Sequence, residues 1–275
     1  MKRALGRAGL AIAALAVAVV ALFPFYWAVV TSLETGSALF TVDYLPAMPH
    51  WQNYTAVFAE QNFGRNILNS ALVATTTVAA SLGLGLFAAF ALARRRFRGR
   101  KAVLYTFLAV AMFPQVAVLT GLYELITGLG LYNRWPGLAL SYLIFTLPFV
   151  VWLLTAFLAE VPREIEEAAL IDRAGPWTLV VRVFLPLVAP GAATAALLAF
   201  IVAWNEFLFA LTFTLTDQAR TVPVAIALIT GASQYELPWG RVMAASVIVT
   251  VPLIALALLC QRRIVAGLTA GAIKG

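Results

Sequence analysis

The stretch VPREIEEAALIDRAGPWTLVVRVFLPLVAPG, from Val161 to Gly191, is the longest charged stretch between apolar segments of this 275-residue chain. Pro162 suits the first position of a helix. The glutamates that follow suit the first turns, because negative charge there meets the positive end of the helix dipole. Gly175 and Pro176 predict the end of this helix about three turns later. Such a helix is too short and too charged to span a bilayer, so we expect it to lie in water beside a membrane.

One face of this expected helix carries Ile165, Ala168, Ala169 and Asp172, which recur at positions i, i+3, i+4 and i+7. The two alanines would let another surface come close, while charged residues cover the other faces. The pattern allows two interpretations. The helix either offers one face to a partner protein or packs on its own chain as an ordinary amphipathic helix.

The segment resembles the EAA loop of bacterial ABC importer permeases, whose pattern is Glu-Ala-Ala, three residues, Gly, nine residues, Ile, one residue, Leu-Pro. Glu167-Ala168-Ala169 and Leu185-Pro186 match, Val183 replaces the isoleucine, and Arg173 stands at the glycine position. We expect Gly175, two residues on, to supply the flexible turn instead. In that family the loop is the coupling helix, which inserts into a cleft on the cytoplasmic ATPase. The resemblance implies ATPase coupling by Glu164, Glu167, Ala168, Ala169, Asp172, Arg173 and Gly175.

Long uncharged runs make up most of the chain, which is 63% hydrophobic and only 11% charged. Each run has at least 20 residues, enough for a membrane-spanning helix. They lie at 8–33, 66–93, 102–123, 135–159, 183–205 and 242–261. The sequence therefore predicts an all-α membrane protein with six transmembrane helices. A β-barrel would instead show segments of about ten alternating residues.

The basic residues predict the orientation. Fifteen of the 19 lysines and arginines fall at the termini and in the loops at 94–101 and 160–182. The positive-inside rule then places both termini and the charged helix in the cytoplasm. The run RRRFRGRK lies between two spans, so a short cytoplasmic loop is favoured over nucleic-acid binding. We expect a cytoplasmic N-terminus at 1–7, a first span and outside loop at 8–65, a five-span core at 66–262 with the coupling helix at 162–175, and a cytoplasmic tail at 263–275.

Two spans contain residues that suggest contacts inside the membrane. Gly85, Ala89 and Ala93 are small residues four apart, a spacing that allows close helix contact. In the third span, Pro114 is expected to bend the helix and free a carbonyl. The adjacent Gln115 either lines a translocation path or bonds to a neighbouring helix.

The fifth span ends in Ala203-Trp204-Asn205-Glu206-Phe207. A carboxylate near membrane depth is costly and is by default a functional candidate. Glu206 could face a polar passage, bind a substrate hydroxyl, pair with another helix or lie at the outer interface. Trp-Asn-Glu/Asp is common here in carbohydrate permeases, which Trp51-Gln52-Asn53-Tyr54 and residues 121–138 also resemble. The resemblance makes Gln115, Asn205 and Glu206 a possible translocation path.

The C-terminal part completes the resemblance. Residues 221–235 are too short for a seventh span, so we expect an outside loop or re-entrant segment. In the maltose-type family the matching loop reaches into the extracytoplasmic solute-binding protein. The candidates here are Thr230, Gly231, Ala232, Ser233 and Gln234. The ending GLTAGAIKG resembles a tail that enters the interface between the two ATPase subunits. It implies contacts by Leu268, Thr269 and Lys274.

The sequence carries no recognisable catalytic motif. None of its three lysines follows a glycine, which excludes a G-x-x-x-x-G-K-[ST] phosphate loop. The resemblance implies the smaller permease subunit of a maltose- or trehalose-type carbohydrate ABC importer in a bacterial cytoplasmic membrane, with the type I ABC importer permease fold. A second homologous permease, two ATPase subunits that bind ATP and Mg, and a solute-binding protein would be its partners. A secondary transporter driven by an ion gradient and a non-conducting assembly subunit are the alternatives.

Overall fold

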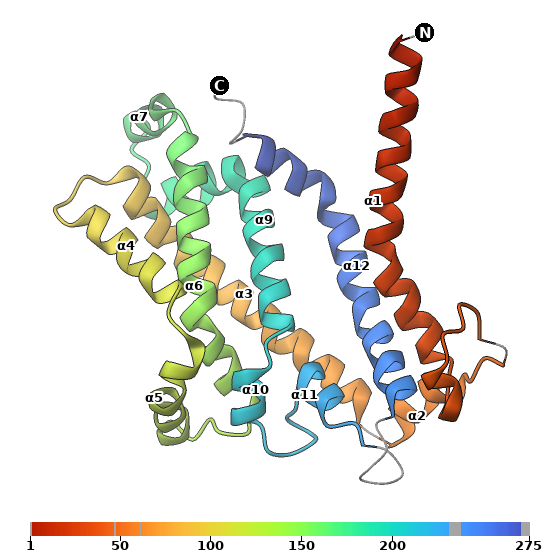
Figure 1. Ribbon diagram of the computed structural model, residues 1–275. Coiled ribbons are helices and arrows are strands. Elements are labelled where there is room, and N and C mark those ends of the chain that lie inside the picture. Colours follow the sequence, from red (N-terminus) through yellow and green to blue (C-terminus); the bar gives the residue numbers. More distant parts are fainter. Residues whose placement is uncertain (1, 47, 61, 231–237, 271–275) are drawn as a thin grey trace. The chain divides into compact units, whose positions relative to one another are not determined.

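The computed structural model describes residues 2–46, 48–60, 62–230 and 238–270, with backbone only at 2–6, 8, 37, 40, 60 and 261–270. This part of the chain is built from helices and contains no strand (Figure 1). The α-helices are α1 (Lys2–Ser32), α2 (Gln52–Glu60), α3 (Phe63–Arg94), α4 (Arg100–Ala111), α5 (Gln115–Gly128), α6 (Trp135–Glu160), α7 (Arg163–Ile171), α8 (Pro176–Thr178), α9 (Leu185–Trp204), α10 (Leu208–Phe213), α11 (Val222–Ala227) and α12 (Trp239–Ala270). A 3₁₀ turn spans Gly36–Phe40 and a π-helical turn spans Leu179–Phe184.

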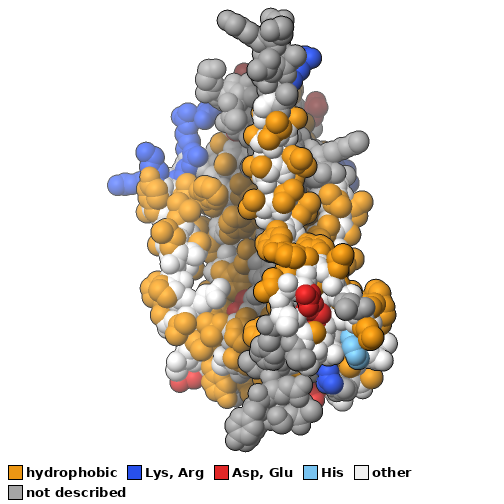
Figure 2. Space-filling view, turned by 45° about the vertical axis from the view of Figure 1, so that its right-hand side comes forward, with side chains coloured by type: hydrophobic (Ala, Val, Ile, Leu, Met, Phe, Trp, Pro, Cys, Tyr) orange, Lys and Arg blue, Asp and Glu red, His pale blue; other side chains and the backbone are white. Residues whose placement is uncertain are grey.

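Within the described residues, five stretches of helix are long and apolar enough to cross a membrane. They are Gly9–Ser32, Phe63–Arg94, Trp135–Glu160, Pro176–Trp204 and Trp239–Cys260. A sixth crossing is formed if the bent pair α4 and α5 counts as one span. The all-α membrane fold is therefore confirmed, with six spans in the described residues when α4 and α5 count as one. Apolar side chains cover much of the face shown in Figure 2, as suits a protein whose solvent is lipid.

The third expected span, 102–123, is not one continuous helix. It is divided into α4 and α5, which meet at an angle of 94°. Pro114 has no N–H to donate and disfavours helical backbone at Phe113, so the helix ends before it and a new one starts at Gln115. The expected bend is thus a break between two helices.

The fifth span starts earlier than the expected residue 183. Its helical path begins at Pro176, continues through the π-helical turn Leu179–Phe184 and then becomes α9. The apolar run hid this start because Arg182 interrupts it. A π-helical turn is rare, and such turns are frequent at functional sites.

The chain forms two compact units. One consists of residues 1–64 and 225–252, and the other of 65–224 and 253–275. In the first unit, Asn53 is buried and its Nδ2 donates to the carbonyls of Ser32, at 2.9 Å, and Glu34, at 3.0 Å. Gly240 packs against the same site, where a Cβ would lie 2.4 Å from the Glu34 carbonyl oxygen. These contacts join the end of α1, the start of α2 and the start of α12.

The second unit has two hydrophobic clusters. The first lies between α3, α6 and α9 and includes Phe90, Leu154 and Phe184. The second lies between α3, α5, α6 and α10 and includes Ile126, Tyr142 and Phe209. Figure 1 shows α7 and α10 at opposite ends of α6. The hydrophobic core of the second unit therefore lies between two regions that contain candidate site residues, one around α7 and the other around α10.

Close contact between α3 and α6 confirms the expectation for the small-residue stripe. A Cβ at Gly85 would lie 2.9 Å from Cγ1 of Val150, and Ala89 is fully buried. Nearby, the hydroxyls of Ser81 and Thr146 form a buried hydrogen bond of 2.8 Å. Small residues and buried hydroxyl pairs are the usual means by which helices associate within a bilayer.

Candidate functional site

Helix α7 connects α6 to the π-helical turn and spans nine residues, somewhat fewer than expected. Val161 and Pro162 have extended backbone, with ψ angles of 131° and 144°, which ends α6. Proline imposes this conformation on the residue before it. Glu164 and Glu166 occupy the first turn, where the helix dipole favours negative charge. Pro162 and the acidic first turn therefore set where α7 starts.

The two faces of α7 differ from the expected division. Ile165 and Ala169 are half-buried, and Ala169 packs against the α3–α6–α9 cluster. Ala168 and Asp172, expected on the same face, are exposed. The exposed stripe consists of Glu164, Glu167, Ala168 and Ile171, at positions i, i+3, i+4 and i+7. Ile171 is 82% exposed, so this outer stripe has an apolar end that the described chain leaves uncovered.

A Schellman turn closes the C-terminal end of α7. The N–H of Ala174 donates to the Ala169 carbonyl at 3.0 Å, and the N–H of Arg173 donates to the Leu170 carbonyl at 3.0 Å. Between them Arg173 has φ +57°, in the left-handed region that glycine adopts most easily. The glycine of the EAA pattern therefore corresponds to the left-handed position of this turn.

Gly175 does not supply the flexible turn that its sequence position led us to expect. Its φ is −68°, an ordinary value for any residue, and it precedes α8 in extended conformation. The expectation for Gly175 was wrong, because the two hydrogen bonds of the Schellman turn fix the left-handed position at residue 173. Arg173 makes the turn itself.

Gln115 lies at the break between α4 and α5. It is half-buried and lines a groove of about 370 Å³ between these helices and α6. The lining is mostly apolar and includes Thr106, Phe113 and Phe145. Gln115 is thus one of two polar side chains in an apolar groove.

Glu206 caps α10, a helix that the sequence did not predict. Its Oε1 accepts the N–H of Phe209 at 2.8 Å and its Oε2 accepts the N–H of Ala210 at 3.1 Å. Only 6% of Glu206 is exposed. These N–H groups have no partner inside the helix, so the carboxylate satisfies them. A glutamate directly before the run FLFALTF was the signal available in the sequence.

Asn205, next to Glu206, is exposed. Its Nδ2 donates to the carbonyl of Ile201 at 2.8 Å, one turn back in α9. Asn205 and Glu206 therefore lie together at the end of α9, whereas Gln115 lines the groove at the break between α4 and α5. The structure brings together two of the three residues of the possible path.

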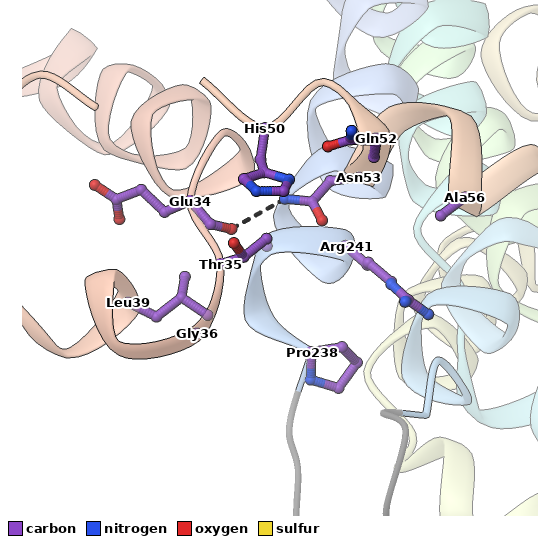
Figure 3. Close-up of a pocket in the computed structure, with 11 residues that line it drawn as sticks. Glu34, Thr35, Gly36, Leu39, His50, Gln52, Asn53, Ala56, Pro238 and Arg241 are labelled. Atoms are coloured by element: carbon purple, nitrogen blue, oxygen red, sulfur yellow. Dashed lines mark hydrogen bonds between the residues drawn. The ribbon is translucent and has the colours of Figure 1, made fainter. Parts of the chain in front are cut away.

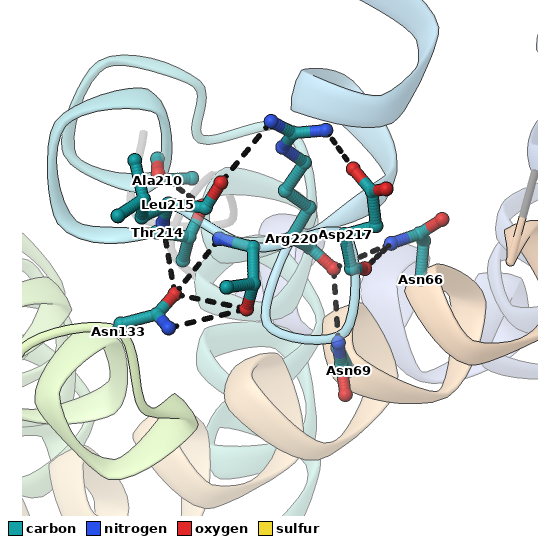
Figure 4. A network of polar contacts seen from close by, with 9 residues as sticks. Asn66, Asn69, Asn133, Ala210, Thr214, Leu215, Asp217 and Arg220 are labelled. Atoms are coloured by element: carbon teal, nitrogen blue, oxygen red, sulfur yellow. Dashed lines mark hydrogen bonds and ion pairs between the residues drawn. The ribbon is translucent and has the colours of Figure 1, made fainter.

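A polar network that the sequence did not reveal holds the loop at 214–221 (Figure 4). Asn66 and Asn69, both on α3, donate to backbone carbonyls of Asp217, Gln218 and Arg220 at 2.8–3.0 Å. Asn133, with φ +58°, accepts the N–H groups of Leu215 and Thr216. Three asparagines separated by up to about 70 residues thus fix one loop.

Arg220 adds charge to this loop. Its guanidinium forms an ion pair with Asp217 and donates to the Leu215 carbonyl at 3.1 Å. Val222, which follows the loop, donates its N–H to the hydroxyl of Ser70 at 2.9 Å. The start of α11 is therefore tied to α3 as firmly as the loop before it.

The first unit contains a polar hollow of about 340 Å³ (Figure 3). Its lining includes Thr35, His50, Gln52 and Arg241. Beside it, Glu34 is 5% exposed. Burial, and to a smaller degree the Asp43 carboxylate, raises the pKa of Glu34.

The remaining predicted site residues lie in or beside parts that the structure does not describe. Thr230 is exposed, whereas Gly231, Ala232, Ser233, Gln234 and Lys274 lie outside the described residues. Leu268 and Thr269 lie in α12, whose helical backbone continues to Ala270, beyond the expected end of the last span at 261. No group of three or more His, Cys, Asp or Glu residues in the described ranges could hold a metal ion.

The helical arrangement defines a multi-pass membrane protein, and comparison with known proteins gives its family. Residues 81–269 match the family described as "Binding-protein-dependent transport system inner membrane component". The chain belongs to this family of ABC importer permeases.

Several curated relatives match over nearly their full length. The trehalose transport system permease protein SugB of Mycobacterium tuberculosis is 41% identical over 93% of each chain. The trehalose/maltose transport system permease protein MalG of Thermococcus litoralis is 40% identical, over 97% of this chain and 96% of the relative. The sulfoquinovosyl glycerol permease SmoH of Agrobacterium fabrum is 38% identical.

Solved structures share the fold. A bacterial ABC transporter that imports the acidic polysaccharide alginate has a chain that matches with a TM-score of 0.77 at 21% identity, covering 94% of this chain and 96% of the other. The alginate transporter in complex with its alginate-bound periplasmic protein matches with a TM-score of 0.67. At this level of identity the likeness concerns the arrangement of helices.

Proposed function

We propose that this chain is a permease subunit of an ATP-driven importer for a carbohydrate, most closely a disaccharide of the trehalose or maltose kind. The observation that carries the proposal is the outer stripe of α7 within a chain of this family. The stripe combines two carboxylates, a small residue and an uncovered isoleucine on one face of a short helix. Such a face suits a complementary groove on a partner, because the alanine permits close approach and the isoleucine gains by burial.

The partner of this stripe is proposed to be a cytoplasmic ATPase subunit. The charge distribution supports this side of the membrane. The end of the second unit that holds α7 also holds the arginines of the loop at 94–101, and positively charged loops favour the cytoplasm. With an even number of spans, both termini would then be cytoplasmic. ATP and Mg would bind to the ATPase, which would supply the energy that this chain's residues do not.

A second homologous permease and an extracytoplasmic solute-binding protein would complete the importer. The family description names dependence on a binding protein, and a solved relative of the same fold carries one. Residues 230–234 are proposed to meet that protein. The proposal for the substrate rests on two relatives, whose names describe transport of trehalose and of trehalose or maltose.

The proposed mechanism links α7 to the spans. Closure of the ATPase dimer would move α7, and the helix would carry this motion into the bundle as a rigid-body displacement. Access to the sugar path would then change from one side of the membrane to the other. The path itself would include Asn205 and Gln115, while Glu206 holds the structure of α10 beside it.

Cysteine crosslinking tests this proposal. In a Cys260→Ala background, Ala168→Cys should crosslink to single cysteines in the cleft of the co-expressed ATPase, and ATP should change the yield. Ile165→Cys, on the half-buried face of the same helix, is the matched control and should crosslink weakly. Equal yields from both positions, or no crosslink with both proteins folded and present, would refute the docking of α7.

A further inference from the structure

The segment at 161–178, which contains α7, contacts α3 at both of its ends. We call residues 161–178 the coupling segment. It leaves α6 at Val161 and continues into the π-helical turn after Thr178. Its middle exposes the outer stripe, whereas its two ends lie against the same transmembrane helix. The two contacts to α3 involve Arg94 and Phe87.

Arg94, the last residue of α3, holds the start of the coupling segment. Its Nη2 donates to the backbone carbonyl of Val161, which follows the last residue of α6. The guanidinium also stands over the ring of Phe184, 4.9 Å from its centroid. Phe184 is fully buried at the end of the π-helical turn. One side chain thus connects α3, the start of the coupling segment and the π-helical turn of the fifth span.

The chemistry of this contact favours an arginine. A carbonyl next to a helix end has no partner inside the helix, and a charged donor makes a stronger bond to it than a neutral one. The flat guanidinium can face an aromatic ring while its nitrogens still donate. On α7, Glu166 attracts the guanidinium at longer range and Arg163 repels it. The position of the Arg94 guanidinium is therefore set by the Val161 carbonyl, the Phe184 ring and the charges on α7.

Phe87 holds the other end of the coupling segment. Its ring stacks on Trp177, with centroids 5.2 Å apart and an angle of 24° between the planes. Phe87 and Arg94 are seven residues apart on α3, which is two helical turns or about 10 Å along the axis. Both therefore project from nearly the same face. Two contacts at this separation fix an orientation, whereas one contact would act as a pivot.

We propose that Arg94 and Phe87 form a two-point clamp through which α3 follows the movement of the coupling segment. They are positioning residues: they touch neither nucleotide nor sugar, and they act by making α3 and α7 move together. The proposal rests on the proposed docking of α7 to an ATPase. Arg94 also carries the displacement to Phe184, so that α3 and the fifth span would respond to the same event.

The experiment uses the importer purified with its own ATPase and binding protein and reconstituted in liposomes. Two quantities are measured. The first is the amount of radiolabelled trehalose taken up per ATP hydrolysed, which we call the transport ratio. The second is the Ala168→Cys crosslink to the ATPase. Arg94→Met keeps an apolar stem over Phe184 but removes the donor and the charge. Phe87→Leu removes the stacking ring at a partly exposed site where folding is little affected. Arg96→Gln, which neutralises an exposed neighbouring charge, is the control.

We expect Arg94→Met to keep the crosslink and to lower the transport ratio about tenfold, the change in an equilibrium that loss of one charge-assisted hydrogen bond produces. Phe87→Leu should lower the ratio by a smaller factor, and Arg94→Lys should restore much of it because it keeps a charged donor. Arg96→Gln should leave the ratio unchanged.

Three results would overturn the clamp. The first is an unchanged ratio in both Arg94→Met and Phe87→Leu with the crosslink intact. The second is a parallel loss of uptake and ATP hydrolysis at constant ratio, which would indicate a structural role only. The third is a transport ratio that falls as much in Arg96→Gln as it does in Arg94→Met. Absence of the crosslink in the wild-type background would instead refute the docking of α7, and the clamp with it.

Discussion

Replacing Arg173 by glycine is expected to stabilise the end of α7 relative to replacement by alanine. Arg173 has φ +57°, a conformation that costs a residue with a Cβ roughly 1–2 kcal/mol but that glycine adopts freely. Glycine loses about 0.5–1 kcal/mol more backbone entropy than alanine on folding. The net advantage of glycine over alanine at this position is therefore roughly 0.5–1 kcal/mol.

Alanine is the right reference because both variants lose the guanidinium. A positive charge at the C-terminus of a helix contributes about 0.3–1 kcal/mol through the helix dipole. A direct comparison of Arg173→Gly with the wild type would mix this loss with the gain in backbone conformation. The difference between Arg173→Gly and Arg173→Ala contains only the backbone effect.

Hydrogen exchange measured by mass spectrometry is a suitable assay, since α7 can open without global unfolding. The amides of Asp172 and Ala174 donate to the carbonyls of Ala168 and Ala169 in the closing turn, at 3.1 and 3.0 Å. Their protection should be roughly two- to fivefold greater in the glycine variant, as the free-energy difference implies. Equal or greater protection in Arg173→Ala would refute the argument that residue 173 pays for a left-handed conformation.

Four further results are expected. Glu206→Gln should lower the midpoint temperature of unfolding in detergent, at a cost of about 1.5–3 kcal/mol of stability. Each of the two carboxylate oxygens accepts one backbone N–H group, whereas the glutamine amide has only one oxygen to accept them. An unchanged midpoint would contradict the capping role of Glu206. Gly85→Ala should cost about 1–3 kcal/mol by crowding α6, whereas Gly83→Ala, where a methyl group meets open space, should not destabilise the protein. Glu34→Gln should raise the midpoint temperature of unfolding at pH 8 but not at pH 4. Because the pKa of Glu34 is raised, the folded state holds the carboxyl proton more tightly than the unfolded state does. The stability of the wild type therefore falls as the pH rises above 4.5, the ordinary pKa of a glutamate. A pH-independent difference would exclude titration of Glu34 as its cause. Glu167→Lys should abolish uptake while the protein stays in the membrane, and normal uptake would count against the outer stripe.

The sequence predicted the features that depend on local composition. Long uncharged runs identified the membrane spans, because the bilayer sets a minimum length for an apolar helix. The small residues near Gly85 predicted a close helix contact, since only their size matters for the approach of two backbones. Pro114 predicted a disturbance of the third span but not its angle, which depends on the packing of α4 and α5.

Contacts between distant residues could not be predicted in this way. Asn66 and Asn69 donate to backbone carbonyls about 150 positions further along the chain, and any residue type at those positions offers the same carbonyl. Arg94 was counted only as one charge in a basic loop, although its guanidinium reaches the carbonyl of Val161. A backbone acceptor leaves no trace in the sequence, so such partners appear only once the chain is folded.

Glu206 shows why a charged residue near membrane depth requires a structure before a role is assigned. Burial of a carboxylate is costly, which made Glu206 a candidate for sugar binding. Both of its oxygens are occupied by backbone N–H groups of α10, so the same cost is offset within the fold. A sugar hydroxyl would have to compete with these bonds or share an oxygen with them. Asn205 beside it is exposed, with only its amide nitrogen donating to α9. Within the Trp-Asn-Glu stretch, the asparagine is therefore the better placed residue to meet a substrate, and the glutamate keeps the helix beside it in position.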